Sequence, residues 1–125
     1  MGHYKSNLRD IEFNLYELLA ADDVLGKGPF ASMDLQTAKS ILGEVERVCS
    51  DDLAASFEDS DRHPPVFDPA THSVTMPESF KKSYKAFVDG GWNTLDLPES
   101  LGGFGAPATL RWACAEMVLG ANPAI

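Results

Sequence analysis

The stretch 90–122, GGWNTLDLPESLGGFGAPATLRWACAEMVLGAN, decides the fold. A glycine-rich turn leads here into a segment, 107–120, that is apolar on almost every side and has only Arg111 and Glu116 as charged residues. A helix of this composition is buried all round, or it belongs to something larger than the sequence shown. Pro107 suits its first turn, where a missing N–H costs nothing. The sequence therefore predicts a helix over 107–120 that needs cover on all sides.

Glu116 is the carboxylate that this helix has to accommodate. A carboxylate is costly to bury without a partner, and no basic residue lies three or four positions away, because Arg111 is five residues back. Two interpretations stay open. Glu116 pairs with a group elsewhere in the fold, which is the commoner outcome for a buried carboxylate, or it lines a cavity that holds a ligand.

Two helices are expected before this segment. The first covers 10–25, where apolar residues recur at helical spacing, and the break at 26–29 ends it. The second begins with Asp34 as its N-cap and ends near Phe57. Its apolar residues follow one another at helical intervals: Ala38, Leu42, Val45, Cys49 and Leu53.

The composition then changes over 58–75, where prolines and polar clusters exclude a long helix. Residues 65–67 and 73–75 predict a small hairpin about a turn at Asp68 and Pro69.

Thr75 and Glu78 resemble a capping box that opens a third helix, and Gly90–91 end it. Residues 92–98 are expected to be extended. The fold class that follows is all-α, a bundle of about four main helices with a possible small hairpin near 65–75. The third helix is predicted to bury a stripe of Phe80, Tyr84, Phe87 and Val88.

Composition restricts the class of protein. The 125 residues suit one domain, and a formal charge of −9 argues against binding nucleic acid or an anionic membrane surface. No apolar run is long enough to span a membrane, and a cytoplasmic location is expected. Cys49 and Cys114 lie in apolar helical settings, where a thiol is usually a small buried hydrophobe.

The chain contains no complete catalytic group of residues. The glycine elbow at 102–105 lacks the Lys and Ser or Thr of a phosphate-binding loop, so a tight connection between helices is the favoured interpretation. No nucleophile has a neighbouring base. No metal site is predicted, because the three histidines have no partner at ligand spacing: His3, His63 and His72.

Several of these residues resemble the N-terminal helical domain of the acyl-CoA dehydrogenases, a flavoprotein family with a PEE-x-GG-x-G turn before a helix that carries one or two acidic residues. The start, 4–15 (YKSNLRDIEFNL), is similar to the N-terminal extension of a longer bacterial subgroup that includes fatty acyl-CoA and methylmercaptopropionyl-CoA dehydrogenases. The resemblance covers nearly the whole chain. The other matching groups are Gly90-Gly91-Trp92, the run 97–105 (LPESLGGFG), Glu116-Met117 and Asn122-Pro123-Ala124.

The resemblance implies a three-part subunit in which FAD lies between a β-barrel-like middle domain and a C-terminal helical bundle, partly against another subunit. A glutamate base there removes the α-proton of an acyl-CoA thioester while the flavin takes the β-hydride. The implied partners are acyl-CoA, an electron acceptor and further copies of the subunit. This fatty-acid β-oxidation chemistry needs the flavin site, which has no counterpart in these 125 residues.

By the same resemblance, residues 1–33 are an N-terminal extension with the first helix, and 34–125 are an incomplete N-terminal α-domain. The chain alone is therefore predicted to bind no FAD, to contain no catalytic residue and to be inactive, as a truncated or processed product. The alternative is a stand-alone helical protein-interaction module without enzymatic activity, which would cover its last helix within the monomer. The residues implied to wall the acyl tail of the substrate are Trp112, Glu116 and Gly120, with Met117 beside them.

Overall fold

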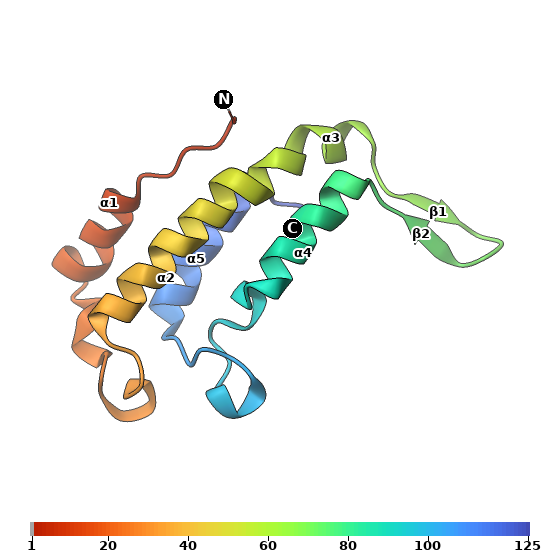
Figure 1. The fold of residues 1–125 in the computed structure, drawn as a ribbon. Coiled ribbons are helices and arrows are strands. Elements are labelled where there is room, and N and C mark those ends of the chain that lie inside the picture. The colour runs from red at the N-terminus through yellow and green to blue at the C-terminus, as the bar shows by residue number, and fades with distance from the viewer. Residues whose placement is uncertain (1) are drawn as a thin grey trace.

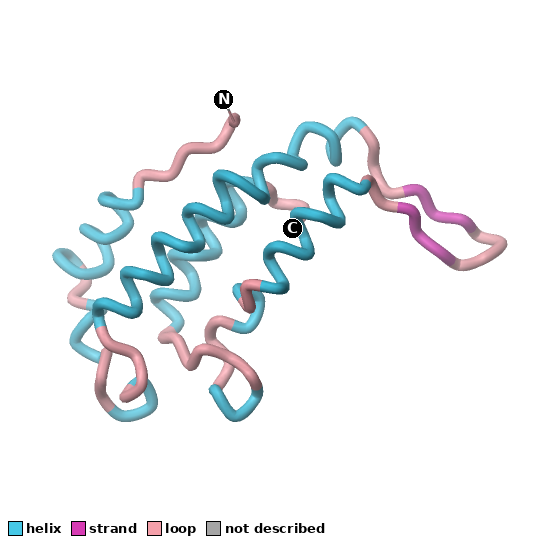
Figure 2. The backbone as a smooth tube through the Cα atoms, viewed as in Figure 1, coloured by secondary structure: helices cyan, strands magenta, loops and turns pink. Residues whose placement is uncertain are grey.

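The computed structural model describes residues 2–125, which form a helical bundle with one two-stranded sheet (Figures 1 and 2). The predicted all-α fold with a small hairpin is confirmed. In Figure 1 the second helix lies in front of the last one, with the first helix on one side and the fourth on the other. The elements are α1 (Leu8–Glu12), α2 (Leu35–Val48), α3 (Phe57–Arg62), β1 (Val66–Asp68), β2 (Ser73–Thr75), α4 (Glu78–Asp89) and α5 (Ala108–Ala121).

The core lies between α2 and α5 and fixes how α5 is rotated about its axis. Each fully buried leucine, valine or methionine side chain stabilises the fold by about 1.5–3 kcal/mol, so this contact holds the bundle together. No helix in residues 2–125 has both the length and the apolar character needed to cross a membrane. The buried stripes are Ala38, Ile41, Leu42, Val45 and Val48 on α2, and Leu110, Cys114, Met117 and Ala121 on α5.

Helix α2 begins as predicted, because the Asp34 carboxylate accepts a hydrogen bond from the Thr37 backbone N–H at 2.7 Å, which also lowers the pKa of Asp34. The predicted end near Phe57 is wrong. The chain stays helical through a π-helical stretch at Cys49–Leu53 and a 3-10 turn, and continues into α3. Side chains from other helices satisfy carbonyls at this irregularity: Ser83 Oγ donates to the Asp52 carbonyl at 2.7 Å and Asn122 Nδ2 to the Leu53 carbonyl at 3.2 Å.

The first helix differs from the predicted 10–25 at both ends. It begins at Leu8, capped by Asn7, and its π-helical continuation ends at Leu18. Ala20 then adopts a left-handed conformation with φ +48°, which turns the chain. The turn is needed because a straight helix would carry residue 25 about 15 Å beyond residue 15, whereas both Leu15 and Leu25 enter the same core.

The predicted hairpin forms, with Phe67 opposite Val74. Its first strand lies one residue later than predicted, because Asp68 pairs with Ser73 instead of belonging to the turn. The predicted capping box does not form, because Thr75 pairs with Val66 in the sheet and α4 starts after Pro77 without a side-chain cap.

The prediction that α4 buries an apolar stripe is wrong, because Ser83 is its one buried residue. Of the predicted stripe, Tyr84 is half exposed and Phe87 is partly exposed. After Gly91, residues 92–94 form a 3-10 turn instead of an extended segment, and this turn lets Leu95 enter the core.

Candidate functional site

Helix α5 has an outward face that no part of the described chain covers. Trp112 and Leu119 are 70% and 56% exposed, whereas Met117, on the buried stripe, is 1% exposed. Trp112 and Leu119 are seven positions apart and therefore lie on the same side of a helix with 3.6 residues per turn. The helix is thus buried on one side only. Of the two alternatives that its composition allows, contact with something larger fits this exposure better than burial within the domain.

Glu116 lies on this outward side and is exposed, so the expectation that it is buried and paired is wrong. The physical reason is its position between Trp112 and Leu119, where its carboxylate keeps contact with water and pays no desolvation cost. Among the ion pairs found in residues 2–125, none involves Glu116. It does border a cavity, which was the other interpretation.

One flank of α5 borders an open, mainly apolar groove of about 300 Å³. Trp112, Val118 and Leu119 line it from α5, and Phe87 and Trp92 line it from α4 and the turn that follows. Arg111 supplies a positive charge, which faces the Asp96 carboxylate at 3.7 Å. The groove therefore suits an apolar ligand or polypeptide better than an anion.

The opposite flank of α5 borders a hollow of about 220 Å³. Its outer wall is residues 4–7 of the N-terminal arm (residues 3–7), together with the start of α1. Glu116, Met117 and Gly120 line it from α5.

The structure thus divides the four residues that the resemblance implies for the acyl wall. Trp112 lines the groove, while Glu116, Met117 and Gly120 line the hollow, because successive residues point about 100° apart around the helix. Met117 also belongs to the core.

Sequence reasoning gave no role to Tyr4, although this residue lines the hollow and lies against α5. A Cβ atom at Gly120 would lie 2.9 Å from Tyr4 Cε2, so the ring packs directly on the glycine backbone. Burial raises the pKa of Tyr4 to about 12. No local pattern could have joined two residues at opposite ends of the chain.

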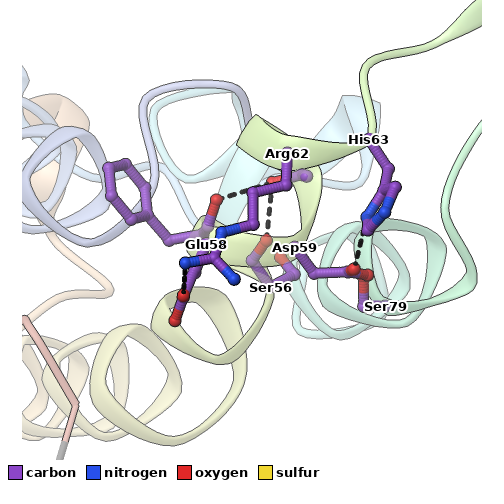
Figure 3. Close-up of polar contacts among 8 residues, drawn as sticks. Ser56, Glu58, Asp59, Arg62, His63 and Ser79 are labelled. Atoms are coloured by element: carbon purple, nitrogen blue, oxygen red, sulfur yellow. Dashed lines mark hydrogen bonds and ion pairs between the residues drawn. The ribbon is translucent and has the colours of Figure 1, made fainter.

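A polar cluster between α3 and α4 was also missed (Figure 3). The Asp59 carboxylate accepts a hydrogen bond from Ser79 Oγ and lies 2.9 Å from His63 Nδ1, and these contacts lower the pKa of Asp59. The carboxylate stands between the hydroxyl and the imidazole. His63 therefore cannot act as the base for Ser79, and the cluster ties α3 to α4 without the geometry of a nucleophile.

The two cysteines are buried, as predicted. Burial raises the pKa of Cys49 and of Cys114 to about 12, so both stay protonated thiols at neutral pH. A protonated, buried thiol is a poor nucleophile and a poor metal ligand.

Neither cavity provides the donors that a flavin dinucleotide needs. Its pyrophosphate requires cations or free N–H groups. In the hollow, the one cation among the described residues that line it, Lys5, lies with Asp10 and Glu116, and on the groove Arg111 already faces Asp96. The residues that line these two cavities therefore do not fit FAD by themselves.

Comparison with known proteins finds no matching family model. Over 125 residues, the whole chain, the sequence is 50% identical to the broad-specificity linear acyl-CoA dehydrogenase FadE5 of Mycobacterium tuberculosis. The chain is homologous to part of an acyl-CoA dehydrogenase.

A second acyl-CoA dehydrogenase gives the same result. Over 119 residues, or 95% of this chain, the sequence is 29% identical to 3-methylmercaptopropionyl-CoA dehydrogenase of Ruegeria pomeroyi. The resemblance to acyl-CoA dehydrogenases is therefore confirmed. In both cases the chain spans 20% of the length of the relative.

Proposed function

We propose that this chain is the N-terminal helical part of an FAD-dependent acyl-CoA dehydrogenase, with residues 1–33 as an extension and 34–125 as the N-terminal α-domain. The observation that carries the proposal is the 50% identity to an acyl-CoA dehydrogenase along the whole chain. The exposed Trp112 and Leu119 support it, since a part of a larger fold leaves apolar surface for its neighbours.

The reaction in this proposal is the α,β-dehydrogenation of a linear acyl-CoA during β-oxidation. Bound FAD would supply the hydride acceptor, from a site formed by other parts of the enzyme. In this proposal Glu116, Met117 and Gly120 help to wall the acyl tail. Trp112, which the resemblance also implied for that wall, lies on the outward face of α5, and this face contacts neighbouring polypeptide, including other subunits. The chain alone is then inactive and without flavin.

A stand-alone interaction module is the second candidate. It requires a monomer that covers its own α5, because an uncovered apolar face drives association. The exposure of Trp112 and Leu119 favours the dehydrogenase over this candidate.

The test is to express this chain together with the coding sequence that continues the same reading frame after Ile125. The proposal predicts a yellow protein whose flavin absorbance bleaches when a straight-chain acyl-CoA is added without an electron acceptor. The 125-residue chain, purified in parallel, serves as the control and should be colourless. A full-length product that holds no flavin, or holds one that no acyl-CoA reduces, would contradict the proposal.

Glu116→Leu tests the acyl wall in that enzyme. Replacing the carboxylate with an apolar side chain should change the preference among acyl chain lengths more than it changes turnover, and Glu116→Gln is the matched control for charge alone. A loss of turnover with an unchanged chain-length profile would contradict the assignment.

A further inference from the structure

The uncovered flank of α5 leaves apolar side chains exposed over two turns of the helix. Trp112 and Leu119 both line the groove, and the seven positions between them span about 10 Å along the helix axis. Both side chains remain mostly exposed. The charge of Arg111 is already matched by Asp96, so the surface requires apolar contact and no counter-ion. A helix laid along the groove can contact both side chains at once, because a helix with its side chains is about 10 Å across.

The end of the described chain lies in this same groove. Ile125 packs against the core and lines the groove together with Trp112 and Leu119. Figure 1 marks this end of the chain beside α4, the helix from which Phe87 lines the groove. Polypeptide that continues from Ile125 therefore begins next to the exposed apolar side chains.

Hydrogen bonds from a buried asparagine fix the position of this end. Asn122 is 1% exposed, and its Nδ2 donates to the Leu53 carbonyl at 3.2 Å and to Ser56 Oγ at 3.1 Å. Its Oδ1 accepts from the Ala124 backbone N–H at 3.2 Å, and its backbone carbonyl accepts from the Ile125 N–H at 3.1 Å. A buried amide with donors and acceptor in use keeps one orientation. The bundle itself thus sets the direction in which the chain leaves α5.

We propose that the segment that follows Ile125 folds back as a helix, occupies the groove and covers Trp112 and Leu119 within the same subunit. This inference rests on the proposed function, in which the chain continues after Ile125. About four fifths of the length of each relative lies outside the part that matches this chain. A segment joined to the edge of the groove is present there at an effective concentration of about a millimolar, which favours it over a separate chain.

The length of the connection limits which residues can cover position 112. A turn between two packed helices takes about 2–8 residues, and Trp112 lies nine positions before the end of α5 at Ala121. In an antiparallel helix, the residues opposite Trp112 should therefore lie within about 25 positions after Ile125.

The experiment identifies what covers position 112 in the full-length enzyme. The photo-crosslinking amino acid p-benzoylphenylalanine takes the place of Trp112, so that an aromatic side chain is kept there. After irradiation and digestion, mass spectrometry should find position 112 joined to a peptide within about 25 residues after Ile125. On a denaturing gel the product should keep the mass of one chain, because the covering segment belongs to the same subunit.

The same amino acid in place of Leu18 is the matched control, since Leu18 is a comparably exposed apolar residue that does not line the groove. It should give no cross-link to that peptide. Position 119 is used instead of position 112 if circular dichroism shows that the first variant does not fold.

Two results separate this inference from the proposed function. In an enzyme that oxidises acyl-CoA, a cross-link from position 112 to a second subunit or to a distant segment, or no cross-link to protein at all, would overturn this inference and leave the proposed function standing. The expected cross-link in a product that holds no flavin would support this inference and overturn the proposed function alone.

Discussion

The two flanks of α5 differ in whether the rest of the chain covers them. On one flank, Trp112 and Leu119 stay exposed beside an open apolar groove. On the other, the N-terminal arm lines the hollow beside the helix and Tyr4 packs on Gly120. The same helix is thus closed by its own chain on one flank and left uncovered on the other. The difference supports the proposal that the uncovered flank contacts other polypeptide.

The largest effect is expected where α5 meets the core. Met117→Ala should lower the free energy of unfolding by about 2–5 kcal/mol, because it leaves a cavity against α2. Trp112→Ala, on the outward face of the same helix, should change it by less than about 0.5 kcal/mol. Urea denaturation of both variants measures the difference. Equal losses would mean that Trp112 is buried in solution and that the comparison fails.

The uncovered flank should make the isolated chain self-associate through residues 107–125. Replacing both Trp112 and Leu119 with alanine should weaken self-association and raise its dissociation constant by about 30-fold, as expected for central aromatic and aliphatic contacts. Sedimentation over a concentration series measures this. The control is Leu18→Ala, which removes an exposed leucine that does not line the groove. A wild-type chain that remains monomeric at high concentration would contradict the prediction.

The parts of the fold that sequence could predict depend on neighbours in the chain. Asp34 caps α2 through the amide three residues on, and the hairpin follows from strand-forming residues on either side of a turn. The π-helical stretch at Cys49–Leu53 could not be predicted. The donors that satisfy carbonyls there, Ser83 and Asn122, come from distant segments. Such local irregularities depend on tertiary packing, which local propensity does not contain.

The features of the candidate site also divide into those that the sequence could predict and those that it could not. Composition left two alternatives for α5, burial on all sides or contact with something larger, and the exposure of Trp112 favours the second. The burial expected for Glu116 was wrong, because composition does not show which side of a helix faces the core. The contact between Tyr4 and Gly120 could not be predicted, since nothing in the local sequence relates the N-terminal arm to the last turn of a distant helix.

The closed flank can be tested through the energetic coupling of its two residues. Alanine is favoured over glycine within a helix by up to about 1 kcal/mol, so Gly120→Ala should stabilise the chain when Tyr4 is already alanine. With the tyrosine present, displacement of the ring should cancel that gain. Thermal unfolding of the wild type, Tyr4→Ala, Gly120→Ala and the double variant measures the coupling free energy between the two residues, which we expect to be about 1 kcal/mol. Additive effects would show that the arm does not rest on α5.

The smallest effect is expected at alkaline pH, where ionisation of Tyr4 should loosen the arm. Burial raises the pKa of Tyr4 to about 12 from its ordinary 10.0, so the folded state holds the phenolic proton more tightly than the unfolded chain does. The stabilisation from this group is complete below pH 10 and is lost as the pH rises towards 12. Tyr4→Phe keeps the ring but has no proton to lose, so its free energy of unfolding should fall less steeply over this range. Tyr16 and both cysteines have raised pKa values and titrate in both proteins, so the difference between the two pH profiles isolates Tyr4. Identical profiles would place the Tyr4 hydroxyl in water, and the arm would then not close this flank.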